Sequence, residues 1–363
     1  KAAAVGYGAK ALANNSAALG PDASASVKNS VAVGPRASAG VVGIASNRGA
    51  GISNQKDSPG PLTNGTAYAF GESSIAIGNS ANAGANGTLA LGDQARAGFV
   101  ENYTGYDGTK DTRANGTYHR GDYAVAIGTS SNASSTNSIA IGYQANASGG
   151  DGFIQNSPNA DSKNPAKSRN YYTIFAKNAV AIGTEANAFS PESIAVGASA
   201  RTGIQGTALE IGEGNSDGAL KSGQNYNYVA NKSIAIGANA TADSDGALAL
   251  GDGAKAGWLE NYEGNTGNDT ERANGTYFHT APNSIAIGSS AKAIGNYASI
   301  AIGASSVSNK ERSLALGYQA TATGKQSVAL GDASQATETY AIALGCAAHA
   351  FADSAIAIGV NAN

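Results

Sequence analysis

The stretch Ser327-Val328-Ala329-Leu330-Gly331 decides the fold of this chain, because close copies of it recur from one end to the other. In most copies a small residue is followed by an aliphatic residue, Ala, a second aliphatic residue and Gly. The copies end on Gly6, Gly20, Gly34, Gly78, Gly92, Gly128, Gly142, Gly183, Gly197, Gly212, Gly237, Gly251, Gly288, Gly303, Gly317, Gly331, Gly345 and Gly359. Of the 17 intervals between these 18 glycines, ten are 14 residues long, two are 15 and five are longer. A short period kept along the whole chain is typical of a repeat architecture.

Each copy has the pattern of a short β-strand. Its two aliphatic residues alternate with Ala, so large side chains lie on one face of the strand and small ones on the other. Both faces are apolar, and we therefore expect both to be buried. The closing Gly allows a tight turn or a positive φ. A second short strand with the pattern Ala-x-Ala follows within a few residues, as in Ala320-Thr321-Ala322 after Gly317.

Two strands and two turns in 14 residues predict one coil of a flattened, all-β parallel solenoid. At a spacing of about 4.7–4.9 Å, a stack of 18 coils would be roughly 85 Å long. The two aliphatic side chains of a coil contribute about 1.5–3 kcal/mol each when buried. Ordering the backbone costs about 1–2 kcal/mol per residue, so a single roll is expected to be only marginally stable. We expect several copies of the chain to pack closely through the small Ala face, and hence an obligate oligomer.

The composition narrows the class of protein. The chain has 363 residues, of which 42% are hydrophobic and 13% charged, and its net charge is −3. Its scattered Lys and Arg residues do not form the basic patch that binding of nucleic acid requires. No run of 18 apolar residues predicts a membrane helix. The absence of Met and of a signal peptide favours a segment of a longer protein, and the single Cys cannot form an intrachain disulfide.

The regular spacing is interrupted five times by sequence that is rich in Gly, Asn and Ser. Because repeats lie on both sides of every interruption, we interpret residues 1–363 as one continuous domain. Regular repeats are expected at 1–39, 72–97, 122–147, 176–213, 229–256 and 283–363. Five inserted loops or hairpins, called the first to fifth inserts in chain order, are expected at about 40–66, 98–121, 148–171, 214–225 and 257–282.

The segments that return from the inserts carry aromatic residues, and we expect them to occupy second-strand positions where plain coils have Ala. The second and fifth inserts are copies of each other, since the stretch from Phe99 to Tyr103 matches that from Trp258 to Tyr262. An Asn-Gly pair in each predicts a hairpin turn. Aromatic side chains dominate binding hot spots. The candidate adhesive residues are therefore Phe99, Tyr103, Trp258, Tyr262, Tyr171, Tyr172, Tyr226 and Tyr228; alternatively, aromatic residues such as Phe99 and Trp258 pin the inserts onto a neighbouring chain.

The repeats resemble those of a known family. Ser284-Ile285-Ala286-Ile287-Gly288 and the stretch ending at Gly331, followed by x-x-Ala/Ser-x-Ala, are similar to the YadA-like head of bacterial trimeric autotransporter adhesins. The inserts look like the head insert motifs of such proteins. The resemblance implies a homotrimeric, left-handed parallel β-roll with structural glycines at Gly78, Gly92, Gly128, Gly142, Gly183, Gly197, Gly237, Gly251, Gly288, Gly303, Gly317, Gly331, Gly345 and Gly359.

The resemblance also implies a location and a function. Such heads are held at the surface of a Gram-negative bacterium by a coiled-coil stalk and a C-terminal β-barrel in the outer membrane, and no heptad run or series of amphipathic strands appears in this sequence. They attach the cell to matrix proteins such as collagen or fibronectin, to host cells, to other bacteria or to abiotic surfaces, and so serve virulence and biofilm formation. The alternative is a rigid structural spacer of a longer fibre, whose ligand sites lie elsewhere.

The sequence contains no constellation of residues that predicts an enzyme. Catalysis needs a nucleophile, a base and an orienting group close together, and the three histidines are far apart in the chain. His119 and His279 both lie nine residues before a repeat glycine, which would allow a ring of histidines in a trimer. We favour ordinary second-strand surface positions for these two histidines. For Cys346 we favour a small turn residue over a reactive thiol. No catalytic residue, cofactor or metal site is therefore expected.

Overall fold

The computed structural model describes residues 1–44, 67–103, 116–148, 151–154, 170–173, 176–207, 225–228, 230–262, 275–279, 281–295 and 297–363. Every regular element within these residues is a β-strand. The strands belong to two compact units. The first comprises residues 1–151 and 171–188, and the second comprises residues 152–170 and 189–363.

In the first unit the predicted coils are present. The five-residue copies form three-residue strands that pair in parallel, each Ala beside the Ala of the next coil. These strands are β1 (Ala3–Val5), β3 (Ala17–Leu19), β5 (Val31–Val33), β9 (Ile75–Ile77), β11 (Leu89–Leu91), β15 (Val125–Ile127), β17 (Ile139–Ile141) and β20 (Val180–Ile182). The Ala-x-Ala segments form two-residue strands, which are β2 (Lys10–Ala11), β4 (Ser24–Ala25), β6 (Ser38–Ala39), β10 (Asn82–Ala83), β12 (Arg96–Ala97), β16 (Asn132–Ala133) and β21 (Asn187–Ala188).

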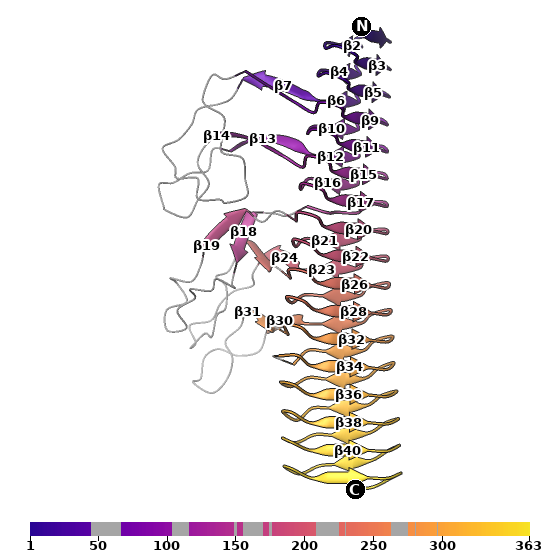
Figure 1. Ribbon diagram of the computed structural model, residues 1–363, viewed down its shortest axis with the longest axis vertical. Helices are drawn as coiled ribbons and strands as arrows, with labels where there is room; N and C mark the ends of the chain where they lie inside the picture. The colour runs from indigo at the N-terminus through magenta and orange to yellow at the C-terminus, as the bar shows by residue number, and fades with distance from the viewer. Residues whose placement is uncertain are drawn as a thin grey trace. The chain divides into compact units, whose positions relative to one another are not determined.

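The second unit repeats this arrangement, and Figure 1 shows its strands β34 to β40 one above the other. Its three-residue strands are β22 (Ile194–Val196), β26 (Ile234–Ile236), β28 (Leu248–Leu250), β32 (Ile285–Ile287), β34 (Ile300–Ile302), β36 (Leu314–Leu316), β38 (Val328–Leu330), β40 (Ile342–Leu344) and β42 (Ile356–Ile358). Its two-residue strands are β23 (Arg201–Thr202), β27 (Thr241–Ala242), β29 (Lys255–Ala256), β33 (Lys292–Ala293), β35 (Val307–Ser308), β37 (Thr321–Ala322), β39 (Gln335–Ala336) and β41 (His349–Ala350). Stacked parallel strands of this kind form a β-roll; its left-handedness stays a prediction.

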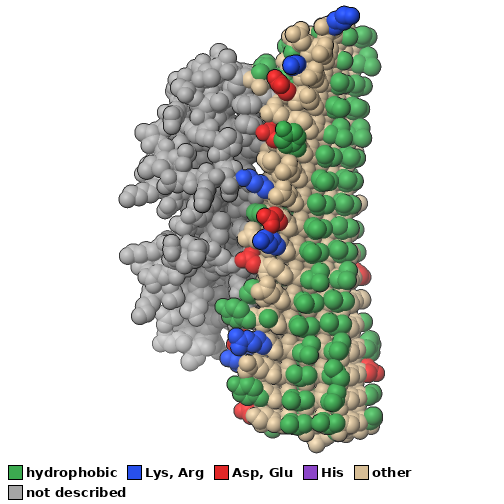
Figure 2. Space-filling model, in the orientation of Figure 1, with side chains coloured by type: hydrophobic (Ala, Val, Ile, Leu, Met, Phe, Trp, Pro, Cys, Tyr) green, Lys and Arg blue, Asp and Glu red, His purple; other side chains and the backbone are tan. Residues whose placement is uncertain are grey.

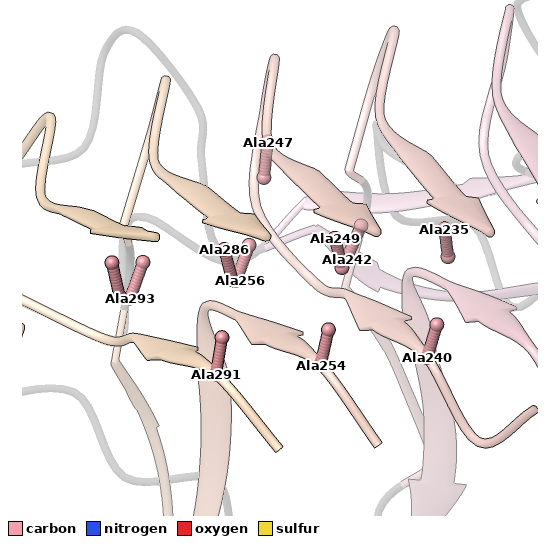
Figure 3. Close-up of a cluster of buried hydrophobic side chains, with 11 residues drawn as sticks. Ala235, Ala240, Ala242, Ala247, Ala249, Ala254, Ala256, Ala286, Ala291 and Ala293 are labelled. Carbon is pink, nitrogen blue, oxygen red and sulfur yellow. The ribbon is translucent and has the colours of Figure 1, made fainter. Parts of the chain in front are cut away.

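The interior of each coil is filled by small side chains. Ala329, at the centre of β38, is fully buried, as are Ser327 before the strand and Ala336 in β39. Figure 3 shows the same arrangement around Ala249, whose methyl group points toward the two-residue strands. Because the two layers of a coil lie close together, the residues between them are nearly all Ala and Ser, with a few slightly larger side chains such as Val27 and Thr88. The Ala face is therefore the core of the roll, and the prediction that it packs against other chains is wrong.

Each coil turns twice, and each turn places one residue in the left-handed region. In the last coils these residues are seven apart, as in Gln319, Gln326, Ala333, Tyr340 and Ala347, whose φ values lie between 51° and 60°. The left-handed conformation costs an ordinary residue roughly 1–2 kcal/mol, whereas Gly and Asn adopt it more easily. This explains the Asn-rich turns of the chain.

One stabilising substitution follows from these turns. Ala333, with φ of 52°, is half-buried in a turn where other coils have Asn or Gly, such as Asn239 and Gly253. Replacing Ala333 with Asn is expected to raise the free energy of unfolding by about 0.5–1 kcal/mol, because Asn tolerates positive φ. Thermal denaturation at fixed protein concentration measures the change, and an unchanged or lower melting temperature would contradict the explanation.

Four inserts leave the roll as antiparallel hairpins. The first pairs β7 (Val41–Ile44) with β8 (Ala67–Phe70), and the second pairs β13 (Phe99–Tyr103) with β14 (Gly116–Arg120). The fourth pairs β24 (Ile204–Thr207) with β25 (Asn225–Tyr228), and the fifth pairs β30 (Trp258–Tyr262) with β31 (Gly275–His279). The third contains β18 (Asp151–Ile154) and β19 (Asn170–Thr173), and Phe153 of β18 lies beside Tyr226 of β25.

The prediction that the return segments fill the second-strand positions is wrong. In the interrupted coils that position is taken by a strand that precedes the insert, such as β6, which pairs with β10, or β12, which pairs with β16. A coil has room for only one such strand, so the return segment becomes the second arm of the hairpin. The first insert consequently extends to Phe70, beyond its expected end at residue 66.

No coil lies between β22 and β26, where the sequence predicts one that ends at Gly212. Residues 208–212 lie outside the described residues, but β22 pairs directly with β26, Ile194 beside Ile234. The fourth insert therefore begins at β24, directly after Gly203, and not at residue 214 as expected. The interpretation of residues 1–363 as one continuous domain stays a prediction.

Candidate interaction surfaces

Two columns of aliphatic side chains cover the outer face of the three-residue strands. In each of these strands the first and third side chains point away from the Ala core, and the parallel register places them above one another. In Figure 2 these columns appear as stacked green side chains that run along the vertical axis. The exposed fractions of Leu316, Leu344 and Ile342 are 37%, 39% and 36%. The strands of each unit thus expose an apolar face, which marks an interaction site.

The two-residue strands present a different face. Their first residues point outward, and in the last coils these are Thr321, Gln335 and His349, which are half-buried. His349 is thus a strand residue on this face, and its ring stacks on that of Phe351 at a centroid distance of 5.1 Å. The aliphatic and polar faces of the roll are therefore distinct, and only the first has the composition of a protein–protein contact.

The candidate adhesive residues all lie on insert strands. Phe99 and Tyr103 are in β13, Trp258 and Tyr262 in β30, Tyr171 and Tyr172 in β19, and Tyr226 and Tyr228 in β25. The two copied inserts have the same register, because Tyr103 pairs with Gly116 and Tyr262 pairs with Gly275. The adhesive role of these residues stays a prediction.

The same registers show that His119 and His279, which the sequence predicts to occupy equivalent positions, occupy different positions in their hairpins. His119 lies opposite Val100, whereas His279 lies opposite Trp258, the counterpart of Phe99. The counterpart of His279 is therefore Arg120. The fifth insert has one more residue between its hairpin and the next repeat glycine, so counting back from the glycine does not align the hairpins. The two histidines do not share one structural position.

The places where the inserts join the roll, which we call the insert roots, are held by side-chain acceptors on neighbouring coils. At the first root, Asn86 Oδ1 accepts the N–H groups of Gly71 and Glu72 at 3.0 and 3.1 Å. At the second root, Asp122 Oδ1 accepts the N–H group of Asn86 at 2.9 Å. These bonds satisfy backbone donors at points where the regular ladder is interrupted.

The roots of the fourth and fifth inserts follow the same rule. Ser190 Oγ accepts the N–H group of Ala230 at 2.8 Å, and Asp245 Oδ1 accepts that of Asn231 at 2.8 Å. Ser244 Oγ accepts the N–H group of Ala281 at 2.9 Å. The sequence pattern did not identify these residues, because each acceptor lies 14 to 40 residues from its donor and belongs to another coil.

Asp243 is the one charged residue in the buried part of the described chain. Its carboxylate accepts two hydrogen bonds from Arg201, from Nη2 at 2.7 Å and from Nε at 3.3 Å. Burial raises the pKa of Asp243 to about 6, although the charges of Arg201 and Lys255 act in the opposite direction. An ionised carboxylate in this position is expensive unless it is paired.

The described residues contain no group of three or more His, Cys, Asp or Glu side chains that could hold a metal ion. Cys346 is an exposed free thiol in the turn after Gly345, as expected. The described residues contain no helix that is long and apolar enough to cross a membrane.

The comparisons with known proteins agree with this geometry. The model of the YadA head domain repeat matches residues 1–23, 13–37, 70–95, 120–145, 133–151, 176–200, 230–254, 280–306, 297–320, 322–345 and 336–362. These segments cover more than half of the chain and stop at each of the five inserts. The unit ending at Gly212 is not matched, in agreement with the direct pairing of β22 and β26. No curated protein matches the chain.

The chain belongs to the YadA head family, whose repeats form adhesin-type domains of trimeric autotransporters on the surface of Gram-negative bacteria. The family is one of adhesins and not of enzymes.

Proposed function

We propose that this chain is the head of a homotrimeric surface adhesin, which attaches a Gram-negative bacterium to host matrix, host cells, other bacteria or abiotic surfaces. The observation that supports this most is the repeat itself. Eleven family matches follow the coils of the roll, and between them five inserts project aromatic strands. The membrane anchor would lie in another part of the parent protein.

The proposed trimer is supported by the aliphatic columns. Three identical rolls can each turn this face toward a common axis, and the contact then closes on itself with cyclic symmetry. The polar face of the two-residue strands remains outside. Light scattering on the purified chain is expected to give a mass near three times 35.8 kDa, with a β-rich far-ultraviolet dichroism spectrum. A folded monomer would refute the trimer.

The mechanism of attachment that we propose is multivalent. Each ligand site occurs three times around the axis, so several weak contacts form at once and their effective concentration multiplies the affinity. No nucleic acid, cofactor or metal enters this mechanism. The inserts carry the selectivity, because they hold the aromatic residues most typical of binding hot spots.

The roll allows a clean test of the inserts. A Cβ on Gly121 would lie 2.7 Å from Gly98 Cα, so these two residues already touch across the second root. Deleting 99–120 would join them as Gly84 is joined to Ala85 in a plain coil, and it would leave a coil of 14 residues. Deleting 258–280 would likewise join Gly257 to Ala281. Both deletions therefore remove a whole insert without changing the stack.

The double deletion is expected to retain the trimer and to lower adhesion at least about tenfold, since every copy of the sites is lost. Adhesion to immobilised matrix proteins, cells and plastic is measured beside the solution mass. A trimer that binds as well as the parent would show that the plain coils carry the sites. A parent trimer that binds none of these surfaces would favour the rigid-spacer alternative.

A further inference from the structure

One short segment contacts the roots of two inserts. Asp243, Ser244 and Asp245, which we call the root clamp, form the turn of the coil between the fourth and fifth inserts. Asp243 binds Arg201 through both of its carboxylate oxygens. Arg201 stands at the start of β23, and the fourth insert leaves the roll three residues later. The strand from which the fourth insert leaves is thus tied to the clamp by an ion pair.

The other two clamp residues bind the remaining arms. Asp245 accepts the N–H group of Asn231, where the fourth insert returns, and Ser244 accepts that of Ala281, where the fifth returns. A Cβ on Gly257, the residue from which the fifth insert leaves, would lie 3.1 Å from Ser244 Cβ. Three consecutive residues therefore contact the coil residues on both sides of two inserts.

The equivalent turn between the first and second inserts shows what is special here. It reads Gly84-Ala85-Asn86, and Asn86 alone binds the two roots on either side. Gly84 stands where the root clamp has Asp243, so the fold does not require an acid at this position. The side chain of Asp243 is only 1% exposed, whereas that of Arg201 is 39% exposed. Asp243 is therefore a buried charge that the fold itself does not require, and it lies between the roots of two inserts.

The groups around Asp243 define how it responds to acid. Arg201 on β23 and Lys255 on β29 are the cations that face it, and Asp245 in the same turn also has its pKa raised by burial. Because the pKa of Asp243 is raised to about 6, the folded protein takes up a proton as the pH falls through that value. Protonation in the folded state then favours folding between about pH 6 and 4, so any loosening is local.

We propose that the root clamp is an acid-sensitive latch: with Asp243 ionised it fixes the roots of the fourth and fifth inserts to each other, and in mildly acidic surroundings the ion pair between Asp243 and Arg201 is lost. This inference rests on the proposed function in one respect, namely that the inserts carry adhesive sites. Loss of the ion pair would loosen the two roots while the roll stays folded. Asp243 is thus a positioning residue.

The only tryptophan of the chain, Trp258, directly follows Gly257 and serves as a probe of the fifth root. Its emission in the full chain is titrated from pH 7.5 to 4.5. His279 lies opposite Trp258 in the hairpin, and an unperturbed histidine side chain changes its charge between pH 5 and 8, so the experiment uses His279→Gln as the reference protein. We expect a transition near pH 6 in the reference protein. The same transition should be absent when Asp243→Asn is added.

Two further variants complete the test. Asp243→Gly introduces the residue that Gly84 provides in the first unit, so it is expected to fold and to lack the transition. Glu192→Gln removes an exposed partner of Lys232 in the same unit and should leave the transition unchanged. A transition that persists in both Asp243 variants, or that is already lost in the His279→Gln reference, would overturn the proposal.

Hydrogen exchange provides the readout for the fourth insert. Protection of the amides in 201–207, corrected for the intrinsic effect of pH, is expected to fall about tenfold between pH 7.5 and 5 in the parent, as loss of a hydrogen bond to a charged group would cause. Amides of β38 should keep their protection. Equal protection of 201–207 at both pH values would overturn the proposal. Neither readout depends on adhesion, so a failure of the proposed function remains distinguishable.

Discussion

Replacing Gly317 with Ala is expected to prevent the roll from forming around that position. Gly317 has a φ of 141°, and a Cβ on it would lie 2.3 Å from the carbonyl oxygen and 2.6 Å from the carbonyl carbon of Gly331 in the next coil. That carbonyl cannot move away, because the ladder bond from Gly331 N to Leu316 O, at 2.9 Å, fixes the coil. Backbone strain alone costs roughly 1–3 kcal/mol, and the clash adds to it.

Two control substitutions separate the causes of this effect. Gly359 has a similar φ of 123° but nothing within 4 Å of its Cβ position, so Gly359→Ala tests the strain without the clash. Gly253 has a φ of 63° and only Ser290 Oγ, at 3.6 Å, near its Cβ position, so Gly253→Ala should cost only the left-handed conformation, roughly 1–2 kcal/mol. Thermal denaturation followed by circular dichroism compares the three variants. A Gly317→Ala variant as stable as Gly359→Ala would mean that successive coils are less closely packed at the glycines than described.

The strand content and the coil could be predicted because both are local. Alternation in stretches such as the one ending at Gly331 indicates a strand, and a 14-residue period leaves room for two strands and two turns. Which face of the strand points into the core could not be predicted in the same way. Alternation distinguishes a large face from a small one, but the thickness of the coil decides which is inside. The two-residue strand indicates which face is inside. Its inward residue Ala336, and Ser334 just before the strand, are small and buried, so the small face of the three-residue strand packs against them.

The candidate sites were predictable only in part. The aromatic inserts were visible as breaks in the period, and the copied hairpins have the equal registers that their sequences imply. The contacts of the root clamp depend on three-dimensional neighbours, since Asp243 and Arg201 are 42 residues apart in the chain. Nothing in the sequence around Asp243 distinguishes it from an ordinary turn residue. Only the stacking of coils shows that its carboxylate is buried.

Replacing Leu316 with Asp is expected to convert the proposed trimer into monomers. Leu316 belongs to the aliphatic columns and is 37% exposed in the single chain, so its remaining surface is what a partner would cover. In a trimer the substitution places three carboxylates on the buried face. Burying one unpaired charge costs several kcal/mol, and three like charges near one axis repel one another as well.

The matched control is Thr321→Asp, which introduces the same charge into the same coil but on the face of the two-residue strands. That variant is expected to remain trimeric. Light scattering at equal protein concentration measures both masses, and circular dichroism shows whether the monomer keeps its strands. If Leu316→Asp stayed trimeric while Thr321→Asp dissociated, the interface would lie on the polar face. If neither variant dissociated, the aliphatic columns would not form the trimer interface and would need another partner.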